Sequence, residues 1–152
     1  SGSATGTAAV AVNGGALAGT GTISGGSALV TVNTGGAIAP GVNTSGNIGV
    51  AGTLHLNGGL SLKDGSQLDM DVSTSDAGGN DQILSTGTLT LPGSGQVTVN
   101  FNMLGASLET DGPYKLIGFA DGSAPSVSTL VATGLTGYMA TFSATSSELD
   151  VT

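Results

Sequence analysis

The chain contains no cysteine, no tryptophan and no arginine among its 152 residues. Without cysteine it can form neither disulfides nor thiolate metal sites. The two basic residues, Lys63 and Lys115, are outnumbered by ten acidic residues, which gives a formal net charge of -8. Binding to nucleic acid or to anionic membranes requires clusters of basic residues. We therefore expect no nucleic acid and no anionic membrane surface as a partner.

Long hydrophobic runs are also absent. No stretch of about 18 apolar residues occurs, so we expect no membrane insertion by this segment. No basic start is followed by an apolar run, so we expect Ser1 to begin a mature or excised segment. Aromatic residues make up 3% of the chain, which leaves little material for stacking against sugars or bases. Most of them lie in the last third of the sequence: Tyr114, Phe119, Tyr138 and Phe142.

The sequence is rich in glycine, with 28 residues, and in aliphatic side chains at alternating positions. The clearest alternation covers residues 51–72, with short interruptions at Asn-Gly-Gly and Lys-Asp-Gly-Ser. Such alternation predicts extended strands with one face in a core and the other in solvent. The stretch therefore predicts three short strands joined by tight corners. Their expected core residues are Leu54, Leu56, Leu60, Leu62, Leu68, Met70 and Val72.

Three corners that combine asparagine with a double glycine recur in the first part of the chain. The double glycines are separated by 21 and 23 positions, a period that indicates a β-solenoid whose coils cover one another. At about 22 residues a coil, the chain would form about seven coils. Asparagine and glycine suit corners with positive φ, and stacked asparagines could hydrogen-bond along the axis. A meander with hairpin turns is the alternative. The predicted corner residues are Asn13, Gly14, Gly15, Asn33, Gly35, Gly36, Asn57, Gly58 and Gly59.

The length of the chain fits one domain, residues 1–152, because no linker-like change of composition divides it. Within it we expect regular coils over about residues 1–103. Residues 104–152 are expected to form less regular coils and a cap. Residues 138–142 and 148–151 predict a closing β-hairpin that contains aromatic residues, because the last coil of a solenoid needs cover for its backbone and apolar side chains.

The order of several segments resembles the C-terminal passenger region of autotransporters and the autotransporter-associated β-strand repeat proteins of bacterial surfaces. The segments are GGAIAPGVNTSGNIGVAGTLHLNGGLSLKDGSQLDMDV, DQILSTGTLTL, GPYKLIGFADG and a terminal ELDVT. The resemblance covers the chain from about Gly14 to its end. It implies a right-handed parallel β-helix that serves as a stalk, adhesin or surface fibre. No catalytic residues belong to this part of the family's pattern.

Asp69 and Asp71 are the first candidates for chemistry. They lie on one face of one predicted strand, about 7 Å apart by strand rise, which is near the carboxylate spacing of an inverting glycosidase. A solvated acidic face that keeps the sheet soluble is the favoured interpretation. A glycosidase would also need an apolar cleft and aromatic rings, and the arginine base of pectate-lyase-like β-helices is missing.

Gly78-Gly79-Asn80-Asp81 matches part of a calcium-binding nonapeptide, but it occurs once and lacks the third glycine. Asp69, Asp71 and Asp81 are the calcium candidates, and an acidic turn is the favoured interpretation. His55 is expected on the outward face, because a lone histidine makes a poor metal site. Thr-x-Thr pairs, as at Thr20 and Thr22, keep ice or mineral binding open as a third possibility. We predict no catalytic residues, no cofactor and no resident metal.

Together these patterns predict a non-enzymatic, extracellular structural or adhesive module of a bacterial surface or secreted protein. We expect it to form a homo-oligomer or filament, and to contact a glycan or a neighbouring cell surface. The alternative is a β-helix that binds, or less plausibly processes, a polysaccharide along an acidic lateral face.

Overall fold

The computed structural model describes residues 8–24, 29–44, 48–110, 112–120 and 122–152, and within these ranges the chain is all-β with no helix. The strands are β1 (Val10–Val12), β2 (Gly15–Gly19), β3 (Thr22–Ile23), β4 (Val30–Val32), β5 (Gly36–Pro40), β6 (Val42–Thr44), β7 (Ile48–Val50), β8 (Thr53–Leu56), β9 (Leu60–Leu62), β10 (Gln67–Val72), β11 (Gln82–Ser85), β12 (Leu89–Thr90), β13 (Val97–Met103), β14 (Tyr114–Gly118), β15 (Leu130–Thr133), β16 (Phe142–Ala144) and β17 (Glu148–Val151).

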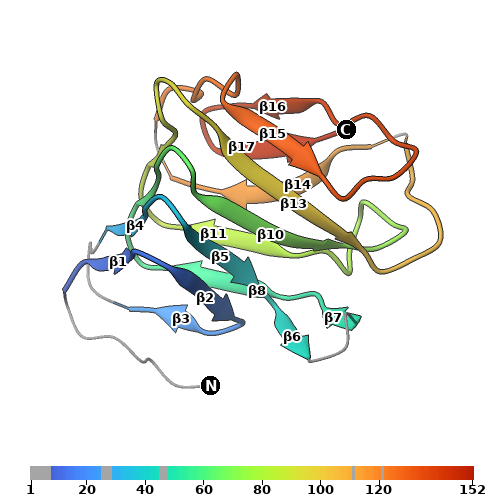
Figure 1. The fold of residues 1–152 in the computed structure, drawn as a ribbon, viewed down its shortest axis with the longest axis horizontal. Coiled ribbons are helices and arrows are strands. Elements are labelled where there is room, and N and C mark those ends of the chain that lie inside the picture. The colour runs from blue at the N-terminus through green and yellow to red at the C-terminus, as the bar shows by residue number, and fades with distance from the viewer. Residues whose placement is uncertain (1–7, 25–28, 45–47, 111, 121) are drawn as a thin grey trace.

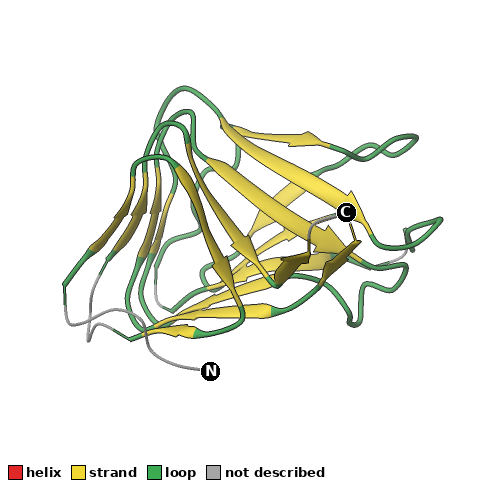
Figure 2. Ribbon diagram, turned by 60° about the horizontal axis from the view of Figure 1, so that its bottom comes forward, coloured by secondary structure: helices red, strands yellow, loops and turns green. Residues whose placement is uncertain are grey.

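Most strands stack in parallel, rung above rung, in three sheets around a common interior (Figure 1, Figure 2). The first sheet has the order β1-β4-β9-β12, the second β2-β5-β10-β13-β15, and the third β3-β8-β11-β14-β17-β16. The chain contributes one strand to each sheet in turn, as β1, β2 and β3 do in the first coil. The fold is a β-solenoid of about three turns, so the solenoid prediction is confirmed.

The coils are longer than the spacing of the double glycines predicts. Val10 pairs with Val30, 20 positions on, whereas Val30 pairs with Leu60 and Leu60 with Leu89, a further 30 and 29 positions along. A period near 22 residues therefore fits only the first coil, and the expectation of about seven coils is wrong. The second coil is longer partly because it carries an antiparallel hairpin, β6 and β7, between β5 and β8.

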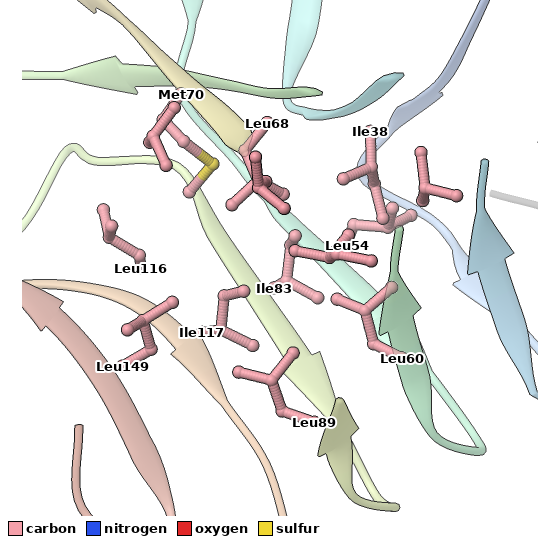
Figure 3. Close-up of a cluster of buried hydrophobic side chains, with 14 of the residues drawn as sticks. Ile38, Leu54, Leu60, Leu68, Met70, Ile83, Leu89, Leu116, Ile117 and Leu149 are labelled. Carbon is pink, nitrogen blue, oxygen red and sulfur yellow. The ribbon is translucent and has the colours of Figure 1, made fainter. Parts of the chain in front are cut away.

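An aliphatic core fills the space between the sheets (Figure 3). In β10, Leu68, Met70 and Val72 are buried, while the three polar residues that alternate with them are partly exposed. In-register stacking places Leu68 between Ile38 of β5 and Val99 of β13. All seven core residues predicted within residues 51–72 are buried. Alternation along each strand, repeated in every coil, thus produces one continuous apolar column.

Glycines with positive φ turn the chain from the first sheet to the second at the same place in successive coils. Gly35, Gly65 and Gly95 have φ of 78°, 72° and 84° and lie 30 positions apart. The amide of Gly35 donates to the carbonyl of Gly65 at 2.9 Å, and the amide of Gly65 to that of Gln96 at 2.8 Å. Glycine adopts this conformation without steric penalty. The turn is therefore repeated and hydrogen-bonded along the axis.

Gly36, at the same turn, lies too close to the neighbouring coil to carry a side chain. An added Cβ would lie 2.4 Å from the carbonyl oxygen of Val12, which accepts the amide of Asn33 at 2.9 Å. We expect Gly36→Ala to lower the free energy of unfolding, measured in urea, by about 2 kcal/mol, as in other overpacked sites. Gly14→Ala is the matched control, because nothing lies within 4 Å of its added Cβ. Equal losses in the two variants would contradict this account.

The third sheet ends differently from the other two, because its last strands are antiparallel. β17 pairs antiparallel with β14 and with β16, and the ring of Phe142 stacks on that of Phe101 with centroids 6.4 Å apart. The first strand of the terminal hairpin begins at Phe142, so the expected strand over residues 138–142 is wrong in its position. That the hairpin caps the solenoid stays a prediction.

Candidate functional site

A polar concave surface lies on the outer face of the second sheet, across β5, β10 and β13. We call it the lateral groove, and its volume is about 360 Å³. Asp69 and Asp71 both line it, as the alternation of β10 predicts. The full lining comprises Ala39, Pro40, Gln67, Asp69, Met70, Asp71, Asp81, Asn100, Phe101 and Asn102. Carboxylates and carboxamides therefore dominate the polar part of this surface.

Each aspartate of β10 is paired with an asparagine on the next coil. The register places Asp69 beside Asn100 and Asp71 beside Asn102. The Asn100 amide Nδ2 donates to Asp69 Oδ1 at 3.3 Å, and Asn102 Nδ2 donates to Asp71 Oδ1 at 2.7 Å. The hydroxyl of Thr133, one coil further, donates to Asn100 Oδ1 at 3.2 Å. A polar ladder thus crosses three successive strands on the outside of the sheet.

The sequence patterns did not single out Asn100, Asn102 and Thr133. The signal was present, because Asn-x-Asn follows Asp-x-Asp at an interval of 31 positions, close to the coil length of this region. This match becomes visible only with a coil length near 30 residues, whereas the spacing of the double glycines indicated a period near 22. The pattern that predicts such a ladder is therefore a pair of acceptor side chains followed, one coil length later in the sequence, by a pair of side chains that can donate.

Asp81 is a buried carboxylate between two coils rather than part of an exposed acidic turn. Its side chain is 2% exposed. Oδ1 accepts the amide of Gly52 at 2.7 Å, and Oδ2 accepts the amide of Asp71 at 2.8 Å. Burial is the main cause that raises the pKa of the Asp81 carboxyl to about 7. The two hydrogen bonds from backbone amides lower this pKa, and the negative charge of Asp71 raises it.

The three calcium candidates line one groove, but each of them already accepts hydrogen bonds from neighbouring strands or coils. Within the described ranges there is no group of three or more histidine, aspartate or glutamate side chains placed to hold a metal ion. Calcium binding by Asp69, Asp71 and Asp81 stays a prediction. His55 lies in β8 with its side chain exposed, on the outward face that alternation predicts.

The asparagine corners form only part of the expected ladder. Asn33 Nδ2 donates to Asn13 Oδ1 at 2.8 Å, which confirms the interaction between the first two coils. The predicted place of Asn57 is wrong. β4 pairs with β9 in a register that places Lys63, and not Asn57, opposite Asn33 on the next coil. Asn57 lies at the corner that follows the third sheet, where its backbone N–H donates to the carbonyl of Ile23 at 3.0 Å. Gly58 and Gly59 belong to that second corner, which stacks on Gly87.

No protein-family model matches the chain, and neither the curated proteins nor the solved structures compared with it give a match. In the part of the chain that the structure describes, no helix is long and apolar enough to span a membrane.

Proposed function

We propose that this chain is a non-enzymatic structural or adhesive module of a bacterial surface or secreted protein, which acts as a rigid β-solenoid outside the cell. The observation that carries the proposal is that its polar side chains hold neighbouring parts of the solenoid together by hydrogen bonds. The side chains that were candidates for chemistry, Asp69, Asp71 and Asp81, all make hydrogen bonds between coils or between adjacent segments of backbone.

Other polar groups make bonds of the same kind. The Thr34 hydroxyl donates to the carbonyl of Asp64 at 2.6 Å, and Asp64 Oδ1 accepts the amide of Gln96 at 2.8 Å. The hydroxyl of Ser85, which is buried, donates to the carbonyl of Gly58 on the adjacent coil. Each bond joins residues about one coil apart, so together they fix the register of the coils along the axis. Such bonds support a scaffold better than a site that must bind and release a substrate.

The location outside the cell is supported by the acidic, cysteine-free composition and by the resemblance to autotransporter passenger regions. Because each coil buries its apolar face against the next, a solenoid of this kind gives an elongated surface from a repetitive chain. We expect that surface to serve in adhesion or in assembly with further copies.

Electron microscopy and sedimentation of the purified protein over a range of concentrations test this proposal. We expect assemblies to grow with concentration, or beads coated with the protein to adhere to cells and glycan-coated surfaces. A protein that remains strictly monomeric and also fails to adhere would overturn the proposal. Hydrolysis of a polysaccharide by the purified chain would overturn its non-enzymatic part.

Binding of a polysaccharide in the lateral groove is the second candidate. The observation that favours it is the row of carboxylate and carboxamide groups, which can exchange hydrogen bonds with sugar hydroxyls. Phe101 lines the groove but is buried in the core, so it offers little area for stacking. A glycan array with and without chelator, repeated on Asp69→Asn, distinguishes the two candidates, because only groove binding predicts a loss of signal in the variant.

A further inference from the structure

We propose that the hairpin of β6 and β7 opens from the solenoid as one unit about a base formed by Gly41 and Gly52, and that the Asp81 side chain is the latch that holds it closed. The inference goes beyond the proposed function and does not depend on it. The hairpin is a sheet of its own that lies outside the stack of coils, between β5 and β8 in the chain (Figure 1). An isolated two-stranded hairpin is marginally stable in water, so its position depends on contacts at its base.

Glycines form both ends of this base. Gly41 has a φ of 82°, a conformation that glycine adopts without steric penalty. A Cβ added to Gly52 would lie 3.1 Å from the Cα of Gly41, so the two ends of the hairpin are in contact. Hinges are often built from such small residues at the ends of elements, because their backbone can absorb a large change of φ and ψ.

Hydrogen bonds attach the base to the neighbouring coils on both sides. The amide of Gly41 donates to the carbonyl of Gly19 at 3.2 Å, and the amide of Gln82 donates to the carbonyl of Gly52 at 3.0 Å. Asp81 adds a side-chain bond, because its Oδ1 accepts the amide of Gly52 at 2.7 Å. A Cβ added to Gly41 would lie 2.7 Å from the same oxygen. The Asp81 carboxyl therefore lies against both ends of the base.

The second oxygen of Asp81 joins the base to β10. Oδ2 accepts the amide of Asp71 at 2.8 Å, and the amide of Asp81 donates to the carbonyl of Asp71 at 2.7 Å. The Asp71 carboxylate packs against Gly49 of β7, so closely that this glycine has no space for a side chain. One carboxyl group thus connects the hairpin base with a strand of the second sheet, and its loss should release the hairpin.

The closed position is unfavourable for a negative charge on Asp81. Its side chain is buried, and among the described residues no basic side chain forms an ion pair with it. Residues 1–62, which include the hairpin, contain no aspartate, glutamate, lysine or arginine, so the whole net charge of -8 lies in residues 63–152. The charged side chains that share the lateral groove with Asp81 are Asp69 and Asp71, whereas β5 and β13 contribute no titratable group to it. Nothing around the carboxyl therefore compensates its charge.

Ionisation of Asp81 should consequently favour the open hairpin. Burial raises the pKa of this carboxyl from 3.8 to about 7 in the closed state, and opening restores its contact with water. Between these values the closed state holds a proton that the open state has released. The equilibrium constant for opening should therefore rise with pH from about 4 to about 7 and stay constant above that range.

Hydrogen exchange of backbone amides in the full chain tests the opening, because the ratio of observed to intrinsic exchange rates gives the opening constant. The reporters are the amides of Gly41 and Gln82, which do not bond to the Asp81 side chain. We expect both to give the same constant, at least tenfold larger than that of the Lys63 amide, which donates to Val32 between coils. Low concentrations of urea should not change it, because a hinge opening exposes little surface. Constants equal to that of Lys63 would overturn the proposal, since the base would then open only when the protein unfolds.

The role of Asp81 is tested by the pH dependence and by Asp81→Asn. In the parent protein the opening constant of both reporters should rise at least tenfold between pH 5 and pH 8, after correction for the intrinsic exchange rates. In Asp81→Asn it should be at least tenfold larger than in the parent at pH 5 and should not vary with pH, whereas contributions from other titrating groups would persist. Circular dichroism verifies that the variant is folded, and the pH series on the parent decides the question if it is not.

Asp64→Asn is the matched control. Asp64 Oδ1 also accepts a backbone amide one coil away, that of Gln96 at 2.8 Å, but its side chain is exposed. We expect this variant to keep the opening constants and the pH dependence of the parent. If Asp64→Asn acts like Asp81→Asn, or if the constants of the parent are the same at pH 5 and pH 8, Asp81 is not the latch.

Discussion

Replacing Leu68 by alanine is expected to lower the free energy of unfolding by about 3 to 5 kcal/mol, a larger effect than the truncation of any exposed side chain should have. Leu68 is fully buried in β10, which has a paired strand on each side, β5 and β13. Figure 3 shows its side chain in the middle of the core, between those of Met70 and Leu54. Truncation leaves a cavity that rigid, hydrogen-bonded coils cannot easily close.

Urea unfolding followed by circular dichroism measures this loss. Leu84→Ala is the matched control, because Leu84 also lies on a strand with a paired strand on each side, β11, but is 37% exposed. We expect its loss to be below about 1 kcal/mol, since its side chain already contacts solvent and truncation leaves no enclosed cavity. Similar losses in the two variants would mean that the apolar column does not determine stability.

The stability of the protein is expected to fall as the pH rises from about 4 to about 8, because of Asp81. Its pKa is raised from 3.8 to about 7 in the native state. Between these values the native state binds more protons than the unfolded chain, so the stabilisation is complete below pH 3.8 and is lost as the pH rises through about 7. We expect a change of about 2 kcal/mol, less than the full shift implies, because water in the lateral groove screens part of the charge.

Asp81→Asn isolates this contribution, since it removes the titrating group and changes little else in volume. The difference between the unfolding free energies of the parent and the variant should depend on pH, whereas contributions from the other acidic residues cancel. A difference that is constant between pH 4 and pH 8 would show that Asp81 does not titrate in this range. The amide of the variant also replaces one acceptor by a donor, so we expect it to be less stable than the parent at every pH.

The strands were predictable because the local pattern and the packing agree. In the strands of residues 51–72 every second side chain is aliphatic, and each of these side chains is buried. The outward positions of His55, Asp69 and Asp71 follow from the same alternation. Burial on one face of a strand requires only a period of two, which a short stretch of sequence displays completely.

The stacking of the coils was less predictable because it depends on residues far apart. Double glycines at 14/15, 35/36 and 58/59 suggested one column, but the third belongs to a different corner of the solenoid. The true column contains Gly35, Gly65 and Gly95. A glycine with positive φ indicates a turn but does not show which corner of the coil the turn forms. Because the hairpin of β6 and β7 also changes the coil length, the spacing of glycines alone could not assign the corners.

The candidate site could be predicted in its residues but not in their roles. Asp69 and Asp71 are where the alternation of β10 places them, on one side of the second sheet. The burial of Asp81 could not be predicted, because it depends on the approach of Gly52 and Asp71 from other parts of the coil. Whether an aspartate is solvated or enclosed is decided by tertiary contacts, and its pKa follows from them.

The confinement of charge to residues 63–152 also determines how the molecule should attach to a solid support. On a cationic resin or a polylysine film, the acidic coils are attracted, whereas the first two coils, which lie within residues 1–62, carry no charge and are not. Adsorbed molecules should therefore adopt one orientation, with the two neutral coils toward the liquid. A layer formed in this way would display the same face of every molecule.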